Sequence, residues 1–251
     1  MSSILTNHSA MTALSTLRNI NTSLSDTQGK ISTGLAIASG KDNAAYFSIS
    51  KTMAGDSGMF KAIDENLTLQ QNAVSTARLG AETLVDLAND FAERVAFAQG
   101  GTEEVRADVQ AELDELVARM STTIAQSTFN GTDYVNSTAN VTVVTGISRS
   151  ASGSISTTTM TFAQQDLGAI QTALDAIDLT AADSAGAQQT ALQTAEAQLS
   201  AAIASATSLG IAERSIETQK EFLGELSDRL DSGIGSMIDA NMEEEAARLQ
   251  A

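Results

Sequence analysis

Residues 60–99 read FKAIDENLTLQQNAVSTARLGAETLVDLANDFAERVAFAQ and carry the clearest periodicity of the chain. Apolar, small or amide side chains recur here in alternating steps of four and three residues, which is the heptad pattern of helices that pack along a seam. A single helix over this stretch would be about 60 Å long, at a rise of about 1.5 Å per residue. That is too long for a compact globule of this size, so a rod of packed helices is predicted. The seam positions are Phe60, Ile63, Leu67, Gln70, Val74, Ala77, Ala81, Leu84, Ala88, Phe91 and Val95.

Before this stretch, residues 11–35 form a second amphipathic pattern. Larger apolar side chains lie mostly three, four or seven positions apart with polar residues between them, which indicates one face of a helix. Glycines at positions 34 and 40 predict that the helix ends in an irregular connector over residues 33–43. The apolar positions are Met11, Leu14, Leu17, Ile20, Leu24, Ile31 and Leu35.

After the seam, Gly100 and Gly101 break the periodicity, and Thr102 is a predicted N-cap with two glutamates in the first turn. A new helix with apolar positions continues from there, so an antiparallel helical hairpin is predicted. These positions are Val109, Leu113, Leu116, Met120 and Ile124.

The middle of the chain changes to alternating β-branched residues over 140–145 and 155–161, which predicts a β-hairpin with its turn in residues 150–154. Helix is predicted to resume at Ala163 and, after a loop near residues 180–186, to continue to Met237. The predicted fold is mainly α: an elongated rod of long antiparallel, coiled-coil-like helices formed by both chain ends, with a small β-hairpin insert in the middle. The termini are expected to pack together, with the insert at the far end of the rod.

Composition supports thin helical layers. Hydrophobic residues make up 42% of the chain but aromatics only 4%, and Pro and Cys are absent, so long helices are permitted and disulfides are excluded. The net charge of -17 would repel phosphate backbones and anionic lipids, which argues against nucleic acid as a partner. No run of 18 apolar residues and no signal-peptide pattern occurs, so membrane insertion is not predicted.

The sequence carries few groups with which to do chemistry. His8 is the only histidine, which excludes a Ser-His-Asp triad and multi-histidine metal sites within one chain. No phosphate-binding glycine motif is present, and the acidic pairs lack EF-hand spacing. No catalytic residue, metal site or cofactor is therefore predicted. Polar residues at seam positions in the long helices, Gln70, Glu213 and Lys220, either fix the helix register or face solvent.

Three segments resemble the bacterial flagellins, especially the alphaproteobacterial branch. The first is Thr6-Asn7 together with ISTGLAIASGKDNAA at residues 31–45, the second is TFNG at residues 128–131, and the third begins at Leu209 and ends in DANMEEE at residues 239–245. The resemblance covers both chain ends and leaves only the middle unmatched. It implies a non-enzymatic structural subunit that polymerises into the extracellular flagellar filament for swimming motility.

The family resemblance also implies partners and rivals. Implied partners are other flagellin subunits, an export chaperone, the flagellar type III export apparatus, and hook-associated and cap proteins. The closest rival is the hook–filament junction protein of the same superfamily. A second alternative, a flagellin with a zinc-peptidase insert, is disfavoured because the chain has a single histidine, His8. A third, a non-flagellar coiled-coil module, would leave the three motif segments unexplained.

The resemblance predicts five segments. Residues 1–40 are the N-terminal inner-core helix, 41–135 the N-terminal arm of the rod, 136–165 the variable hairpin, 166–238 the C-terminal arm, and 239–251 the start of the C-terminal inner-core helix. Flagellins usually continue past this point for several helical turns, so 239–251 is expected to be a shortened form of that helix. Only if the rest of that helix is truly absent from the protein are the terminal helices expected to be disordered or rearranged and polymerisation to be impaired.

Residues assigned to subunit assembly lie on the N-terminal apolar stripe and in the two terminal motifs. They are Leu14, Leu17, Ile20, Leu24, Ile31, Leu35, Lys41, Asp42, Asn43, Ala44, Ala45, Asp239 and Asn241.

A last segment concerns the animal innate-immune receptor for flagellin, which in family terms binds an arginine-rich stretch. This chain has NDFAERVAFAQ at residues 89–99, where Arg94 matches but Ala92 and Ala96 replace an Arg and a Leu. Together with Glu112, these residues are predicted to form a weakened receptor segment.

Overall fold

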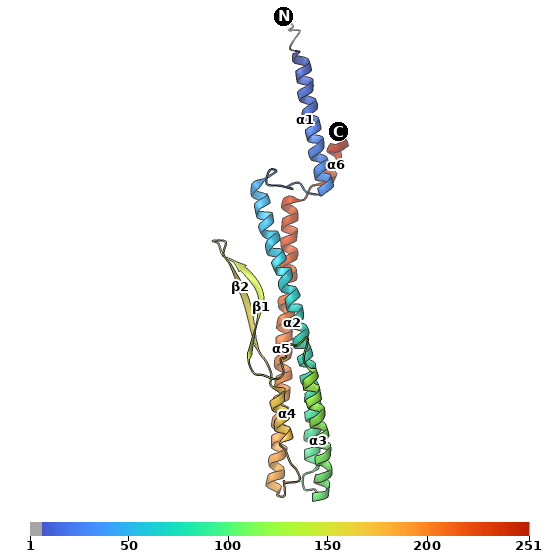
Figure 1. Ribbon diagram of the computed structural model, residues 1–251, viewed down its shortest axis with the longest axis vertical. Coiled ribbons are helices and arrows are strands. Elements are labelled where there is room, and N and C mark those ends of the chain that lie inside the picture. The colour runs from blue at the N-terminus through green and yellow to red at the C-terminus, as the bar shows by residue number, and fades with distance from the viewer. Residues whose placement is uncertain (1–6, 251) are drawn as a thin grey trace. The chain divides into compact units, whose positions relative to one another are not determined.

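The computed structural model describes residues 7–250, so Thr6 of the first motif, the start of the 1–40 segment and residue 251 lie outside it. The chain is mainly α-helical with one two-stranded antiparallel sheet, as predicted (Figure 1). It divides into two compact units: unit 1 runs up to Lys61 and resumes at Glu225, and unit 2 runs from Ala62 to Gly224. The elements are α1 (His8–Thr33), α2 (Ala44–Phe97), α3 (Glu103–Gln126), β1 (Asn140–Arg149), β2 (Ile155–Ala163), α4 (Leu167–Asp175), α5 (Ala185–Ile238) and α6 (Met242–Gln250).

Helix α2 confirms the seam and extends it. It begins at Ala44, well before the seam, because the Asn43 side chain caps its first turn by accepting hydrogen bonds from the backbone N–H groups of Ala45 and Tyr46. Most seam positions are buried, whereas Ile63 and Gln70 are only half-buried. Many buried positions are alanines, which let neighbouring helices approach closely. The buried seam residues are Phe60, Leu67, Val74, Ala77, Ala81, Leu84, Ala88, Phe91 and Val95.

Polar seam residues pair across elements. In unit 2, Glu213 of α5 lies 2.5 Å from the Nε of Arg78 of α2, and the ammonium of Lys220 donates to the side-chain oxygen of Gln71 at 3.0 Å. Gln70 accepts a hydrogen bond from the hydroxyl of Tyr134. Of the two interpretations left open by the sequence, the one in which polar residues fix the register is therefore the better supported.

Unit 1 holds a comparable polar layer between the first part of α2 and the last part of α5. The hydroxyl of Ser57 lies 3.1 Å from that of Ser227 and donates to Asp231 at 2.8 Å. Lys61 donates to the second oxygen of Asp231 at 2.7 Å. Because these hydrogen bonds, that from Lys61 foremost, favour the carboxylate, they hold the pKa of Asp231 below its ordinary value.

The turn from α2 to α3 is built as the sequence predicts. Gly100 has a φ of 72°, a left-handed conformation that favours glycine, and the hydroxyl of Thr102 accepts from the N–H of Val105. The buried guanidinium of Arg106 then donates to the carbonyl oxygens of Leu179 and Gly101, at 3.1 and 2.9 Å. The start of α3 is thereby fastened to the loop that precedes α5.

The TFNG motif that follows α3 forms a tight turn. Asn130 and Gly131 have φ values of 48° and 79°, and the residues on either side, Phe129 and Thr132, exchange two backbone hydrogen bonds. Positive φ at both central positions is typical of a type I′ turn, for which Asn-Gly is the preferred pair.

The β-hairpin corrects one expectation of the sequence. Instead of forming the far end of the molecule, it packs beside α5 within unit 2: Gln219 donates to the carbonyl oxygen of Thr145, and Gln165 donates to the hydroxyl of Ser208. A two-stranded sheet is marginal alone, so β1 buries Val143 and Thr145 against the helices. The strands pair from Asn140↔Ala163 to Arg149↔Ile155, with a register shift between Val144 and Gly146.

A second correction concerns the start of the helix after the hairpin. Ala163 is the last residue of β2, and helix resumes only at Leu167, where the Asp166 carboxylate caps the turn by accepting from the N–H of Ala169. The cap was not recognised in the sequence. The following loop spans residues 176–184, slightly earlier than predicted.

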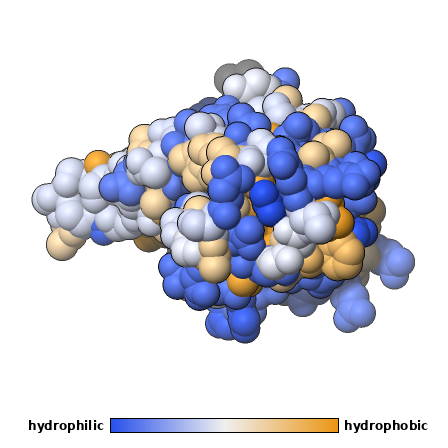
Figure 2. Space-filling view, turned by 90° about the horizontal axis from the view of Figure 1, so that it is seen from below, coloured by the Kyte–Doolittle hydropathy of each residue, from blue (hydrophilic) through white to orange (hydrophobic). Residues whose placement is uncertain are grey.

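Surface character is consistent with the acidic composition. Hydrophilic residues predominate in the view onto the end of unit 2 where α2 passes into α3, and the projecting hairpin is mostly near white, which reflects its Ser and Thr content (Figure 2). Within residues 7–250, no helix combines the length and hydropathy needed to span a membrane.

Candidate functional site

Helix α1 presents its apolar stripe to solvent. No residue of this helix is buried, and Leu17 and Ile20 are each 57% exposed. Of the stripe residues assigned to assembly, only Ile31 and Leu35, near the end of the helix, are half-buried. A continuous row of large exposed apolar side chains is typical of a surface that binds another protein. The exposed members of the row are Met11, Leu14, Leu17, Ile20 and Leu24.

The end of α1 is joined to the segment after α5 by backbone hydrogen bonds. The N–H of Ala36 donates to the carbonyl oxygen of Ile238 at 2.7 Å, and the N–H of Ala240 donates to that of Gly34 at 2.9 Å. Leu35 and Asp239 thus form an isolated antiparallel bridge. The structure therefore brings together two predicted assembly segments that lie about 200 positions apart in the sequence.

The KDNAA motif at residues 41–45 builds a turn and a helix cap. One carboxylate oxygen of Asp42 accepts from the N–H of Ala38, and from the N–H and hydroxyl of Ser39 at 2.9 and 3.1 Å. These bonds, those from Ser39 foremost, lower the pKa of Asp42. Asn43 caps α2, whereas Lys41 and the two alanines of the motif are exposed. The acidic and amide side chains are thus engaged within the chain, and the exposed Lys41 remains available to a partner.

Helix α6 is the short counterpart of α1 in unit 1. Its first turn is capped by Asn241, whose side-chain oxygen accepts from the N–H groups of Glu243 and Glu244. Glu245 is buried, and its Oε1 lies 3.4 Å from the Nζ of Lys30 on α1 and 3.5 Å from Arg248. Its Oε2 is a buried oxygen for which the described residues supply no hydrogen-bond partner. Glu245 belongs to the DANMEEE motif, but no role for it could be predicted from the sequence, because only the fold shows that it is buried.

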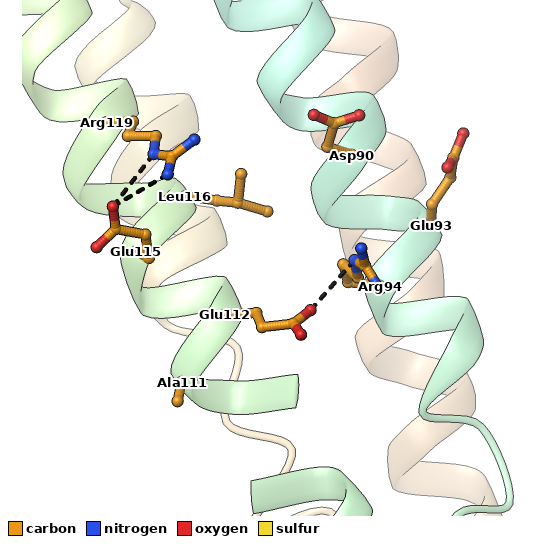
Figure 3. Close-up of a pocket in the computed structure, with 8 residues that line it drawn as sticks. All are labelled: Asp90, Glu93, Arg94, Ala111, Glu112, Glu115, Leu116 and Arg119. Carbon is orange, nitrogen blue, oxygen red and sulfur yellow. Dashed lines mark hydrogen bonds and ion pairs between the residues drawn. The ribbon is translucent and has the colours of Figure 1, made fainter. Parts of the chain in front are cut away.

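A groove between α2 and α3 contains two residues of the predicted receptor segment, Arg94 and Glu112 (Figure 3). It has a volume of about 550 Å³, and six of its eight lining residues are charged. Arg94 of α2 pairs with Glu112 of α3 at 3.2 Å, and Arg119 pairs with Glu115 within α3 at the same distance. Both pairs are more than half exposed, so they contribute little to stability.

Residues of the predicted receptor segment do not all reach this groove. Arg94 and Glu112 lie in it together, and Ala96 is exposed on α2, but Ala92 is only 8% exposed. Ala92 therefore belongs to the packed face of α2. Leu116, predicted to be a core position of α3, is half-buried and lines the groove, while the neighbouring Val117 is buried in its place.

The described residues do not gather the groups needed for metal chemistry. Between residues 7 and 250, no three His, Asp or Glu side chains are placed to hold a metal ion. His8 is exposed at the start of α1. Ser57, Asp231 and Lys61 resemble a nucleophile with a polar relay, but the lysine contacts the carboxylate and not the serine. The side chains of Lys61 and Asp231 are about half exposed.

Comparison with known proteins shows which family this chain resembles along its length. Residues 4–140 match the family model of the bacterial flagellin N-terminal helical region. The chain is 34% identical over 255 residues to a flagellin of Brucella melitensis, an alignment that covers 100% of this chain and 90% of the relative. It is 31% identical over 296 residues to flagellin C of Rhizobium meliloti, covering 100% and 91%. The crystal structure of Bacillus cereus flagellin superposes with a TM-score of 0.42 at 15% identity, over 74% of this chain and 94% of that chain.

The family model and the full-length relatives place this chain in a class of structural proteins that polymerise into filaments. The family model covers more than half of the chain, and the relatives align along all of it. The chain belongs to the bacterial flagellin family, and its similar relatives include alphaproteobacterial members. As a flagellin it is a subunit of the flagellar filament, and nothing in these comparisons favours the hook–filament junction protein.

Proposed function

We propose that this chain acts without catalysis, as a subunit that is exported and then polymerises outside the cell into the flagellar filament. The observation that carries the proposal is the exposed apolar stripe of α1, in which no residue is buried. Such a stripe is poorly suited to an isolated subunit but well suited to packing among the helices of other copies. Full-length similarity to flagellins supports the same conclusion.

The proposed partners follow from this function. Copies of the chain are the main partner, and an export chaperone, the type III export apparatus, and hook-associated and cap proteins are proposed in addition. We infer that residues 1–40 with 239–251 form the inner layer of the filament and that 41–135 with 166–238 form the layer around it. The bridge between Leu35 and Asp239 supports this division, because it joins the two inner segments where each meets its arm.

Seeded growth tests the proposed function. The purified chain is added to short fragments of its own filaments, and sedimentation and electron microscopy follow the gain in polymer. We expect elongation of the seeds by the unaltered chain. Replacing Leu17 and Ile20 by Ser should abolish growth, because it removes the apolar stripe, while leaving the circular dichroism of the monomer nearly unchanged. A matched control replaces the polar Thr16 and Thr22 by Ser on the same helix, and growth should persist.

Failure of the unaltered chain to bind or elongate seeds would overturn the proposal. Normal growth of the Leu17→Ser/Ile20→Ser variant would show that the apolar stripe of α1 is not required for assembly. The motif residues would then be the remaining predicted assembly residues.

For the animal receptor, we propose weak activation. The guanidinium of Arg94 is paired with Glu112. The position that holds an arginine in the family's segment is here the buried Ala92. The position that holds a leucine is the exposed Ala96, which offers a partner a smaller apolar side chain. A reporter-cell assay with purified monomer should give little signal. Ala96→Leu should raise it and the control Ala111→Leu, across the groove, should not. Strong signalling by the unaltered chain would contradict the proposal.

A further inference from the structure

A groove between β2 and α5 differs from the other surface hollows of unit 2. It has a volume of about 490 Å³, and its walls are formed by one end of β2 and the middle of α5. Met160 and Phe162 form the strand side, and Ile211 and Ala212 lie on the helix side. Ile211 is 63% exposed, so a large apolar side chain stands at the groove with most of its surface in water.

Both walls of the groove are held in place within unit 2. The rings of Tyr134 and Phe162 meet edge to face, with centroids 5.4 Å apart, which fixes the strand side. Gln165 donates to the hydroxyl of Ser208 at 3.1 Å, which ties the base of the hairpin to α5. Figure 1 shows the base of the hairpin meeting α5. A groove with fixed walls requires little ordering when a partner enters it, and this favours binding.

Charge distinguishes this groove from its neighbours. None of its ten lining residues is charged, whereas six of the eight lining residues are charged in the α2–α3 groove of Figure 3. Five of eight are charged in the groove around Arg78. The chain as a whole carries a net charge of -17. Two copies therefore repel each other over most of their surface but not at this groove.

The sequence shows that the uncharged character extends beyond the groove itself. Residues 197–212 of α5 and residues 150–165, which include all of β2, contain no Asp, Glu, Lys or Arg. Ile203 on this part of α5 is 49% exposed, and Ile155 at the start of β2 is 48% exposed. The cores of protein interfaces are depleted of charged residues and enriched in apolar ones, so this surface has the composition of an interface core.

The edge of β2 strengthens the argument. The described sheet has two strands, so β2 has one edge without a strand partner. Proteins that stay monomeric protect such edges with lysines, prolines or bulges on the edge strand. Strand β2 has no charged residue and no proline, and the register shift of the pair lies in β1. Nothing in its sequence discourages the approach of another chain.

We propose that the uncharged groove between β2 and α5 is a contact surface for a second copy of this chain, the neighbouring subunit of the filament. The inference rests on the proposed function and specifies one surface through which it is carried out. A second copy is the occupant because the chain belongs to a polymerising family and because this is the place where two strongly acidic copies meet without opposing charges.

The test introduces charge into the groove without disturbing the core. Ile211→Glu replaces an isoleucine that is already mostly exposed with a carboxylate side chain, so the monomer should fold normally. Burying that charge at an interface is costly, and we expect the concentration needed for seeded growth to rise about tenfold or more. The matched control is Leu79→Glu, because Leu79 is also 63% exposed but lies beside Arg78 on α2, outside the uncharged surface. It should change the growth concentration less than about twofold.

A second measurement reads the environment of the groove directly. The chain has no cysteine, so Ile211→Cys and Leu79→Cys each provide one labelling site for a polarity-sensitive fluorophore. On polymerisation, the emission at position 211 should shift to the blue and that at position 79 should not.

The outcomes separate the inference from the proposed function. Growth of the unaltered chain with equal growth of Ile211→Glu, or an unshifted emission at position 211, overturns the groove as a contact surface and leaves the filament function standing. Equal impairment by both glutamate variants also overturns it, since an added negative charge would then slow growth whether or not it lies in the groove. Absence of growth by the unaltered chain overturns the proposed function, and the groove inference falls with it.

Discussion

Gly80 is the glycine of α2 with the least room for a side chain. A Cβ added there would lie 1.8 Å from the hydroxyl oxygen of Ser127, the residue that follows α3, and 2.6 Å from its Cβ. The Ser127 hydroxyl donates to the carbonyl oxygen of Thr123 at 2.6 Å, so it cannot move aside without losing a hydrogen bond. Glycine here permits the close approach of α2 to the end of α3.

Gly80→Ala should therefore lower the free energy of unfolding by about 1–3 kcal/mol, the usual cost of overpacking. Urea unfolding followed by circular dichroism measures the change. Gly224→Ala in α5 is the matched control, because nothing lies within 4 Å of its added Cβ. There the better helix propensity of alanine should stabilise by up to about 1 kcal/mol. Combining Gly80→Ala with Ser127→Gly should recover part of the loss; no recovery would mean that Ser127 is not the obstacle.

Asp42 makes the turn before α2 sensitive to acid. Because its pKa is lowered in the folded state, chiefly by the hydrogen bonds from Ser39, the carboxylate stabilises the fold above its unfolded pKa, ordinarily 3.8. That stabilisation is lost as the pH falls through the lower, folded value. NMR titration of the Asp42 carboxyl carbon should give a pKa below 3.8. Ser39→Ala, which removes the hydroxyl donor, should move it back toward 3.8, and a pKa at or above 3.8 in the unaltered chain would contradict the assignment.

At the scale of elements, α3 is fastened to the loop before α5 mainly by polar side chains. Arg106, whose side chain is 10% exposed, donates to two backbone carbonyl oxygens and contacts Asp183 at 3.3 Å. Gln110 accepts from the N–H of Leu179 and donates to the carbonyl oxygen of Ile177. Gln188 accepts from the N–H of Gly100 and completes the attachment from α5.

Arg106→Ala should cost roughly 2–4 kcal/mol of unfolding free energy, because it leaves carbonyl oxygens without donors in a buried setting. Arg119→Ala is the control, since that arginine makes an exposed pair within one helix and should cost less than about 1 kcal/mol. Urea unfolding compares the two. Arg106→Lys should recover little, because an ammonium lacks the planar fork that reaches both carbonyl groups. Equal effects of the two alanine variants would show that burial of Arg106 is unimportant.

At the scale of the whole molecule, charge should control polymerisation. Copies that each carry a net charge of -17 repel one another, and salt screens that repulsion. Raising the ionic strength from about 10 mM to about 150 mM shortens the screening length from about 30 Å to about 8 Å. Seeded growth should accelerate across this range, as measured by light scattering at constant subunit concentration. Growth that slows with salt would indicate that ion pairs between subunits, not apolar contacts, dominate the interface.

Much of the secondary structure was predictable from local patterns. The seam, the glycine break after α2, the Thr102 cap and the hairpin turn each depend on residues within a few positions of one another. The start of α4 was placed too early because the Asp166 cap was overlooked, and the start of α2 before the seam was not predicted. Family membership could also be predicted, because the family's motifs form local structures such as the Asn130-Gly131 turn and the Asn43 helix cap.

The sequence by itself therefore determined the helical character, the β insert and the family of this protein, because periodicity and turn chemistry act over short distances along the chain. Only the tertiary structure decided where the hairpin packs, that Ala92 is buried, and that Glu245 and Arg106 are buried with charged partners. It also brought the uncharged parts of β2 and α5 to one groove. Each of these depends on contact between residues far apart in sequence, and periodicity within one helix contains no information about which distant residue will meet it.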